Sequence, residues 1–133
     1  MKYLELKQKH MGEWNAFPFI WAFSDKQLKE GMEKMGVTPE ELVRIPHGGF
    51  IKRTDSNRLA TLLIRHDREM KELFKDDRAL VEAMEYELAN HEYTVTWDAG
   101  PALRALGLES SVEDIDERTE ACLAVALRRF EQD

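Results

Sequence analysis

The sequence predicts an α+β fold, a mainly helical single domain with a small antiparallel sheet and a central helical hairpin. Apolar residues recur every three or four positions over most of the chain, as they do along one face of an amphipathic helix. Short β-branched and aromatic runs interrupt these helical patterns, and a pair of glycines separates two of the runs. Because 133 residues is the size of one ordinary domain, we expect residues 1–133 to form a single compact domain.

The composition is that of a cytoplasmic globular protein. A hydrophobic content of 43% with 34% charged residues excludes a disordered chain. No apolar run approaches the ~20 residues that a membrane span needs, and the first residues lack the apolar core of a signal peptide. The single cysteine, Cys122, excludes an internal disulfide and suits a reducing compartment.

Negative charge is concentrated in the C-terminal part of the chain. Of the formal net charge of −7, residues 76–133 contribute −10, from five basic and fifteen acidic side chains. The rest of the chain is slightly basic. An acidic surface of this kind repels nucleic acid and membranes and attracts a basic protein. We therefore expect a protein partner and no direct nucleic-acid or membrane binding.

The first half of the chain predicts two helices and a strand. An apolar stripe extends over residues 2–17 until Pro18, which cannot continue a helix. The apolar run over residues 19–23 is typical of a buried strand. Ser24 then caps a helix over residues 25–35, with Gln27 completing a capping box and Gly36 following the end of the helix.

A short helical turn and a hairpin follow. Thr38 and Pro39 open a helix of one or two turns. The runs 43–45 and 50–52 flank the sequence Pro-His-Gly-Gly, which predicts a β-hairpin over residues 43–52.

The second half predicts four helices and one more strand. Helices over residues 56–75 and 78–91 have so short a connection that we expect them to pack as an antiparallel hairpin. The run 93–97 predicts a third contributor to the sheet, beside 19–23 and 43–52. A short helix over 101–106, capped by Asp98, precedes a final helix over 112–131, capped by Ser110 or Ser111.

Polar residues gather where the helix over 78–91 ends, and they predict a polar pocket. Asn90 and His91 lie in its last turn, and Glu87 lies one turn earlier. In the hairpin, His66 would come within about one helical turn of His91. The predicted pocket comprises His66, Glu87, Asn90, His91 and Tyr93.

Three interpretations of this pocket stay open, and we favour the first. The histidines form a hydrogen-bonded structural pair, bind a metal together with Glu69 or Glu87, or provide a general base. The Glu-x-x-His pattern of ferritin-like metal sites is absent, so we expect no metal and no cofactor. Cys122 lies on an apolar stripe, and no serine lies in a Gly-x-Ser-x-Gly motif. We therefore expect no catalytic residue and no enzymatic activity.

Two other groups of side chains are candidates for partner binding. The aromatic cluster consists of Trp14, Phe17, Phe19, Trp21 and Phe23, and it suits either a domain core or an interface. Acidic residues crowd the start of the last helix and the turn before residue 78. The predicted partner-binding set is Glu109, Glu113, Asp114, Asp116, Glu117, Glu120, Asp76 and Asp77, with Glu82 and Glu85 beside it.

Several motifs resemble one group of small proteins. They are Ala22-Phe23-Ser24-Asp25-Lys26-Gln27-Leu28 with Glu30-Gly31, Gly48-Gly49-Phe50-Ile51, Glu87-Leu88-Ala89-Asn90-His91-Glu92-Tyr93-Thr94 and Ala105-Leu106-Gly107-Leu108. Over residues 16–108 the chain is similar to uncharacterised proteins of bacterial genomes, phages and other mobile elements. The resemblance assigns no catalytic residue. It implies the context of a mobile element, in which modulators of host or defence machinery, such as anti-CRISPR inhibitors, act by binding.

We therefore expect a non-enzymatic, acidic binding protein of the phage or mobile-element type. Its partner would be a protein, with a basic nucleic-acid-binding groove as the favoured target, and self-association stays open. One alternative is a small-ligand or metal-binding protein, or an enzyme, centred on His66 and His91. Another is a phage housekeeping protein that contacts only itself.

Overall fold

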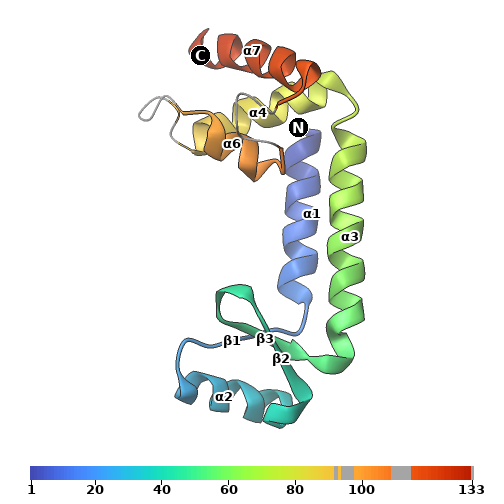
Figure 1. Ribbon diagram of the computed structural model, residues 1–133, viewed down its shortest axis with the longest axis vertical. Coiled ribbons are helices and arrows are strands. Elements are labelled where there is room, and N and C mark those ends of the chain that lie inside the picture. Colours follow the sequence, from blue (N-terminus) through green and yellow to red (C-terminus); the bar gives the residue numbers. More distant parts are fainter. Residues whose placement is uncertain (92, 94–97, 109–114, 133) are drawn as a thin grey trace. The chain divides into compact units, whose positions relative to one another are not determined.

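A computed structural model describes residues 1–91, 93, 98–108 and 115–132 of the chain (Figure 1). It divides into two compact units. Residues Lys9–Arg68 form the sheet unit, and residues Met1–Gln8 with Glu69–Asp133 form the helical unit. The mainly helical α+β class is confirmed. Association of the two units into the expected single domain stays a prediction.

The sheet unit contains three short antiparallel strands in the order β1-β3-β2. They are β1 (Ile20–Trp21), β2 (Leu42–Ile45) and β3 (Gly49–Lys52). The predicted hairpin over 43–52 is confirmed, with Leu42 paired to Lys52 and Ile45 to Gly49. Its connection is a 3₁₀ turn, Pro46–Gly48, in which Gly48 has a φ of 82° that favours glycine. The strand predicted over 19–23 is shorter than expected, because Pro18 and the capping residue Ser24 lie close to its ends.

Three helices precede, separate and follow these strands along the chain. They are α1 (Lys2–Ala16), whose first residues belong to the helical unit, α2 (Asp25–Met35) and α3 (Ser56–Leu73), with single 3₁₀ turns at Pro39–Glu41 and Arg53–Asp55. The Ser24 hydroxyl accepts a hydrogen bond from the Gln27 amide at 3.2 Å, so the predicted cap is confirmed. Gly36 ends α2 in a left-handed conformation, with a φ of 69°.

One buried cluster of the sheet unit lies between α2 and one face of the sheet. Ile20, Ala22 and Leu42 are buried there. They contact partly buried side chains of α2 and its surroundings, namely Leu28, Met32, Met35, Val37 and Phe50. Since side chains alternate along a strand, the neighbouring residue Trp21 faces the other way and is 45% exposed.

The helical unit is organised around α4 (Asp77–Asn90), which is buried on most sides. It packs against α7 (Glu117–Gln132) and α6 (Gly100–Ala105). The fully buried side chains Leu80, Met84 and Leu88 lie on the apolar stripe that the sequence predicts. None of the described helices is long and apolar enough to cross a membrane.

Three boundaries in the helical unit differ from expectation or lie outside the described residues. The last helix begins at Glu117 and not at residue 112, because the Asp116 carboxylate accepts the Thr119 amide at 2.7 Å and caps it there. Of the predicted strand 93–97, only Tyr93 is described, and it is helical; its ring packs edge-on against Phe130. The proposed caps Ser110 and Ser111 lie outside the described residues.

Two other predicted features of this unit are the short helix near 101–106 and the helical hairpin of α3 with α4. The short helix near 101–106 is confirmed as α6, but its N-cap is Ala99 and not the predicted Asp98. The Asp98 carboxylate accepts the Gly100 amide at 2.9 Å in the turn before the helix. The short connection between α3 and α4, at Phe74–Asp76, is also confirmed. Because most of α3 belongs to the sheet unit, its antiparallel packing against α4 stays a prediction.

Two helical glycines allow a matched test of the packing between α2 and β1. A Cβ atom on Gly31 would lie 2.5 Å from Cγ2 of buried Ile20, whereas one on Gly12 of α1 would meet nothing within 4 Å. Alanine is favoured over glycine in a helix by about 1 kcal/mol. Overpacking a buried contact costs about 1–3 kcal/mol.

We expect Gly12→Ala to raise the free energy of unfolding and Gly31→Ala to lower it, by about 1 kcal/mol each. Urea unfolding followed by circular dichroism measures both. Equal stabilisation by the two substitutions would contradict the close approach of α2 to β1.

Candidate functional site

The most concentrated set of polar contacts in the helical unit surrounds the carboxylate of Glu87. This side chain projects from α4 into the core and is 0% exposed. Its Oε1 atom accepts the Tyr3 hydroxyl at 2.5 Å and the Lys7 ammonium at 2.7 Å. Its Oε2 atom lies 3.2 Å from Nε2 of His91 and accepts the amide of Asn90 at 3.4 Å. Each carboxylate oxygen thus has two partners.

Helical spacing explains how so few elements supply these partners. Asn90 and His91 follow Glu87 by three and four residues, so they lie on its face of α4. Tyr3 and Lys7 are four residues apart on α1 and share one face in the same way. The Glu87 site therefore joins the first turns of α1 to the last turns of α4.

The protonation states follow from burial and from these hydrogen bonds. Burial is the largest influence on Glu87 and acts to raise its pKa, but hydrogen bonds from Lys7 and Tyr3 and the Lys7 charge together lower it below the ordinary value. Burial, and then the bond to Glu87, raise the pKa of Tyr3. Glu87 is therefore an ionised acceptor and Tyr3 a protonated donor. A carboxylate with both oxygens occupied is suited to holding the core together.

The structure brings three of the predicted pocket residues together, Glu87, Asn90 and His91. Tyr93 contacts the Phe130 ring, at 5.9 Å between centroids. Sequence reasoning missed Tyr3 and Lys7, whose contacts with Glu87 span 84 and 80 residues. No local pattern connects residues so far apart; only their shared helical face was visible in the sequence.

His66 belongs to the sheet unit, where it has partners of its own. Its ring stacks on His10 at 3.9 Å, and its Nε2 atom lies 3.4 Å from Oε1 of Glu13. A pocket shared by His66 and His91 would join the two units and stays a prediction. Among the described residues, no group of three potential ligands could hold a metal ion.

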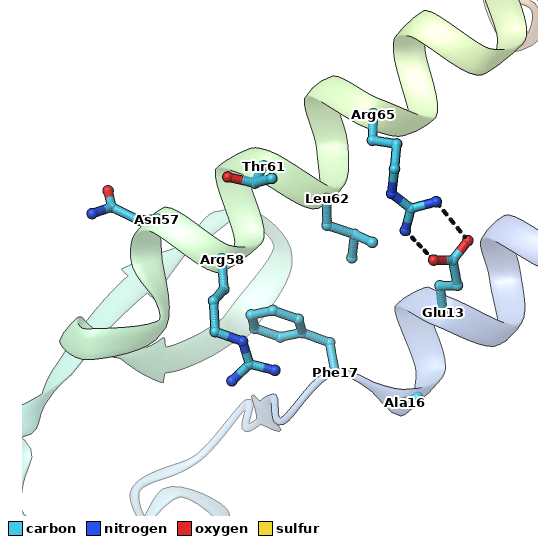
Figure 2. Close-up of a pocket in the computed structure, with 8 residues that line it drawn as sticks. All are labelled: Glu13, Ala16, Phe17, Asn57, Arg58, Thr61, Leu62 and Arg65. Carbon is cyan, nitrogen blue, oxygen red and sulfur yellow. Dashed lines mark hydrogen bonds and ion pairs between the residues drawn. The ribbon is translucent and has the colours of Figure 1, made fainter.

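A cleft of about 560 Å³ lies between the end of α1 and the first turns of α3 (Figure 2). Its lining residues are Glu13, Ala16, Phe17, Asn57, Arg58, Thr61, Leu62 and Arg65. Arg65 donates two hydrogen bonds to the Glu13 carboxylate, and these bonds are the main cause of the lowered Glu13 pKa. The Arg58 guanidinium lies over the Phe17 ring at 5.3 Å and donates to Asp55 at 3.0 Å. Both arginines are thus already paired with carboxylates of the sheet unit.

The aromatic cluster is only partly buried. Phe19 lies between Trp14 and Trp21, with centroid distances of 4.5 and 5.0 Å. At the β1 end of the cluster, Trp21 is 45% and Phe23 82% exposed. These rings lie outside the buried cluster of Ile20, Ala22 and Leu42, which is on the opposite face of β1.

The predicted acidic residues have two kinds of role in the described part of the chain. Asp76 caps α4, Asp77 pairs with Arg118 at 2.7 Å, and Asp116 caps α7. Glu117 and Glu120 are exposed in the first turn of α7 and form no ion pair among the described residues. Glu109, Glu113 and Asp114 lie outside the described residues.

Cys122 is buried in the helical core, where the sequence places it. Burial raises the pKa of its thiol, which keeps the thiol protonated. This environment is that of a structural cysteine.

The chain belongs to a family of unknown function, DUF7659, whose sequence profile matches residues 2–128. The match includes the Glu87 site, the cleft and all described helices almost to the end of α7. The chain has no match among curated proteins and none among solved structures.

Replacing Glu87 tests the role of its charge. We expect Glu87→Gln to lower the free energy of unfolding at pH 7 by about 1–3 kcal/mol, because it weakens the hydrogen bonds of Lys7 and Tyr3. The pKa of Glu87 is lower in the folded than in the unfolded chain. Its stabilisation is therefore complete above pH ~4.5 and is lost as the pH falls through the lowered pKa. Urea unfolding between pH 7 and pH 3 measures the free energy of unfolding of both proteins. We expect the difference between these free energies to narrow as the pH falls.

Tyr3→Phe is the matched control, since it keeps the ring contacts with Phe74 and Tyr86 and removes one donor. We expect a loss of about 1 kcal/mol, with the pH dependence retained through Lys7. A Glu87→Gln protein as stable as the unmodified chain at every pH would contradict this account of the site.

Proposed function

We propose that the protein is a non-enzymatic binding protein that engages a basic protein partner through an acidic surface of the helical unit. The observation that carries the proposal is the separation of charge between the two units. The helical unit has nine basic and eighteen acidic side chains, a formal charge of −9, whereas the sheet unit has ten and eight, a charge of +2. A field of one sign on one unit steers a partner of opposite charge.

Within the helical unit, Glu117 and Glu120 are the best candidates to contact the partner. Both are exposed, and neither caps a helix nor pairs with a cation among the described residues. Asp76 and Asp116, by contrast, hold helix N-termini through their hydrogen bonds. Their negative charge adds to the surface field, but their side chains already have a structural role.

A partner with a basic groove, of the kind that holds nucleic acid, matches this surface in charge. The sequence resemblance to small proteins of phages and mobile elements supports a target in the nucleic-acid-handling or defence machinery of a cytoplasm. The alternative of an enzyme centred on His66 and His91 has less support, because Glu87 has both oxygens occupied and His66 has neighbours of its own.

Reversing two charges tests the acidic surface. The tagged chain would be incubated with host lysate in 0.1 M and 1 M salt, and retained proteins would be quantified by mass spectrometry. We expect a stoichiometric partner at 0.1 M salt that is lost at 1 M, because the Debye length shrinks from about 10 to 3 Å. We expect Glu117→Lys with Glu120→Lys to reduce its retention at least about tenfold.

The matched control reverses two exposed acids of the sheet unit, Glu33→Lys with Glu40→Lys, which changes the net charge of the chain by the same amount. Retention of the partner by this control and loss by the first variant would locate binding on α7. The electrostatic proposal would be refuted if the amount of partner retained changed neither with salt nor with either variant.

A further inference from the structure

A second groove, of about 560 Å³, lies along the edge of the sheet. One wall is β1 with the residue before it, and the other wall is α2, which Figure 1 shows running beside the sheet. Its lining residues are Phe19, Ile20, Trp21, Gln27, Glu30, Gly31, Lys34 and Met35. Gly31 contacts Ile20, and Gln27 contacts Phe23, so α2 runs antiparallel to β1.

The strand that forms this wall is an edge strand with one open position. The sheet order β1-β3-β2 leaves β1 with a partner on one side only. The Ala22 amide donates to Gly48 at 2.9 Å, and Ile20 is paired with Phe50. Because backbone groups alternate in direction along an antiparallel strand, the N–H and C=O of Trp21 point away from β3.

The neighbouring outward amides are already satisfied within the chain. The Phe19 amide donates to the Phe17 carbonyl at 2.9 Å, and the Phe23 amide donates to Oε1 of Gln27 at 2.8 Å. Among the described residues of this edge, Trp21 is left as the position where another strand can pair. Its ring is 45% exposed and lines the groove beside the open position.

The helical wall of the groove carries two opposite charges in a fixed order. Glu30 and Lys34 are one helical turn apart, both are exposed, and neither forms an ion pair among the described residues. Four residues of helix advance about 6 Å, and two residues of strand advance about 6.7 Å. Alternate side chains of an extended peptide in the groove would therefore match the spacing of Glu30 and Lys34.

We propose that this groove binds an extended segment of a partner protein, which adds to β1 as an antiparallel strand. The segment would pair with the backbone of Trp21 and place alternate side chains against α2. An added antiparallel strand runs in the same direction as α2, so it meets Glu30 before Lys34. The segment therefore carries Lys or Arg followed, two residues later, by Asp or Glu. The proposal concerns the sheet unit and does not rest on the acidic surface of the helical unit.

Peptides of defined charge order test this directly. The probes are fluorescent, terminally blocked nonapeptides of Val and Thr that contain Lys-Val-Glu or Glu-Val-Lys at the centre. Binding is measured by fluorescence anisotropy with the full chain. We expect the Lys-Val-Glu peptide to bind at least about tenfold more tightly than its reverse. N-methylation of its alternate backbone amides should abolish binding, because it removes the donors that pair with Trp21.

An exchange of the two charges supplies the decisive variant. We expect Glu30→Lys with Lys34→Glu, which leaves the net charge unchanged, to reverse the preference between the two peptides. The matched control exchanges Lys29 and Glu33, which are exposed on the same helix but do not line the groove. It should leave the preference unaltered. Trp21→Pro removes the open amide, so it should weaken the binding of both peptides relative to Trp21→Val.

Three results would overturn the proposal. The first is equal binding of the two charge orders, and the second is undiminished binding of the N-methylated peptide. The third is a chain that dimerises in light scattering, dissociates on Trp21→Pro and binds no peptide. That outcome would assign the edge to pairing between two copies of this chain.

Discussion

A carboxylate inside an apolar core is stable only if hydrogen-bond donors replace the water that it has lost. Glu87 meets this requirement with hydrogen bonds from Tyr3, Lys7 and Asn90, and His91 lies 3.2 Å away. Met84 and Leu88 of the same helix belong to the apolar core of this unit. The arrangement holds the first turns of α1 against α4, although they are far apart in the sequence. The packing of α6 and α7 on α4 depends in turn on the position of α4.

The sheet unit is held together by different means. Its strands are only two to four residues long, and its small core depends on the close approach of Gly31 to Ile20. Short strands form few ladder hydrogen bonds, so the sheet unit relies more on apolar burial. The contact between α2 and β1 provides much of that burial. The same contact creates the groove beside β1. A weakly paired edge strand is a liability in a soluble fold, and its outward amides at Phe19 and Phe23 are accordingly satisfied within the chain.

The two proposed interaction surfaces differ in physical character. The acidic surface of the helical unit acts through its field, so it affects the rate of encounter and responds to salt. The groove of the sheet unit acts through backbone pairing and side-chain spacing, so it selects a segment by its sequence. Each surface belongs to one unit, and variants in one unit therefore serve as controls for the other.

The sequence by itself determined most of the helices, the Ser24 cap and the hairpin, because apolar periodicity, the Ser24 hydroxyl and the glycines near residue 48 act within a few residues. It also determined that Glu87, Asn90 and His91 share a face. Only the tertiary structure decided that Tyr3 and Lys7 complete the Glu87 site, that Asp116 begins the last helix, and that Trp21 occupies an open edge. Those features depend on contacts between distant segments, on which of several possible caps is used, and on strand order, and none of these has a local signature.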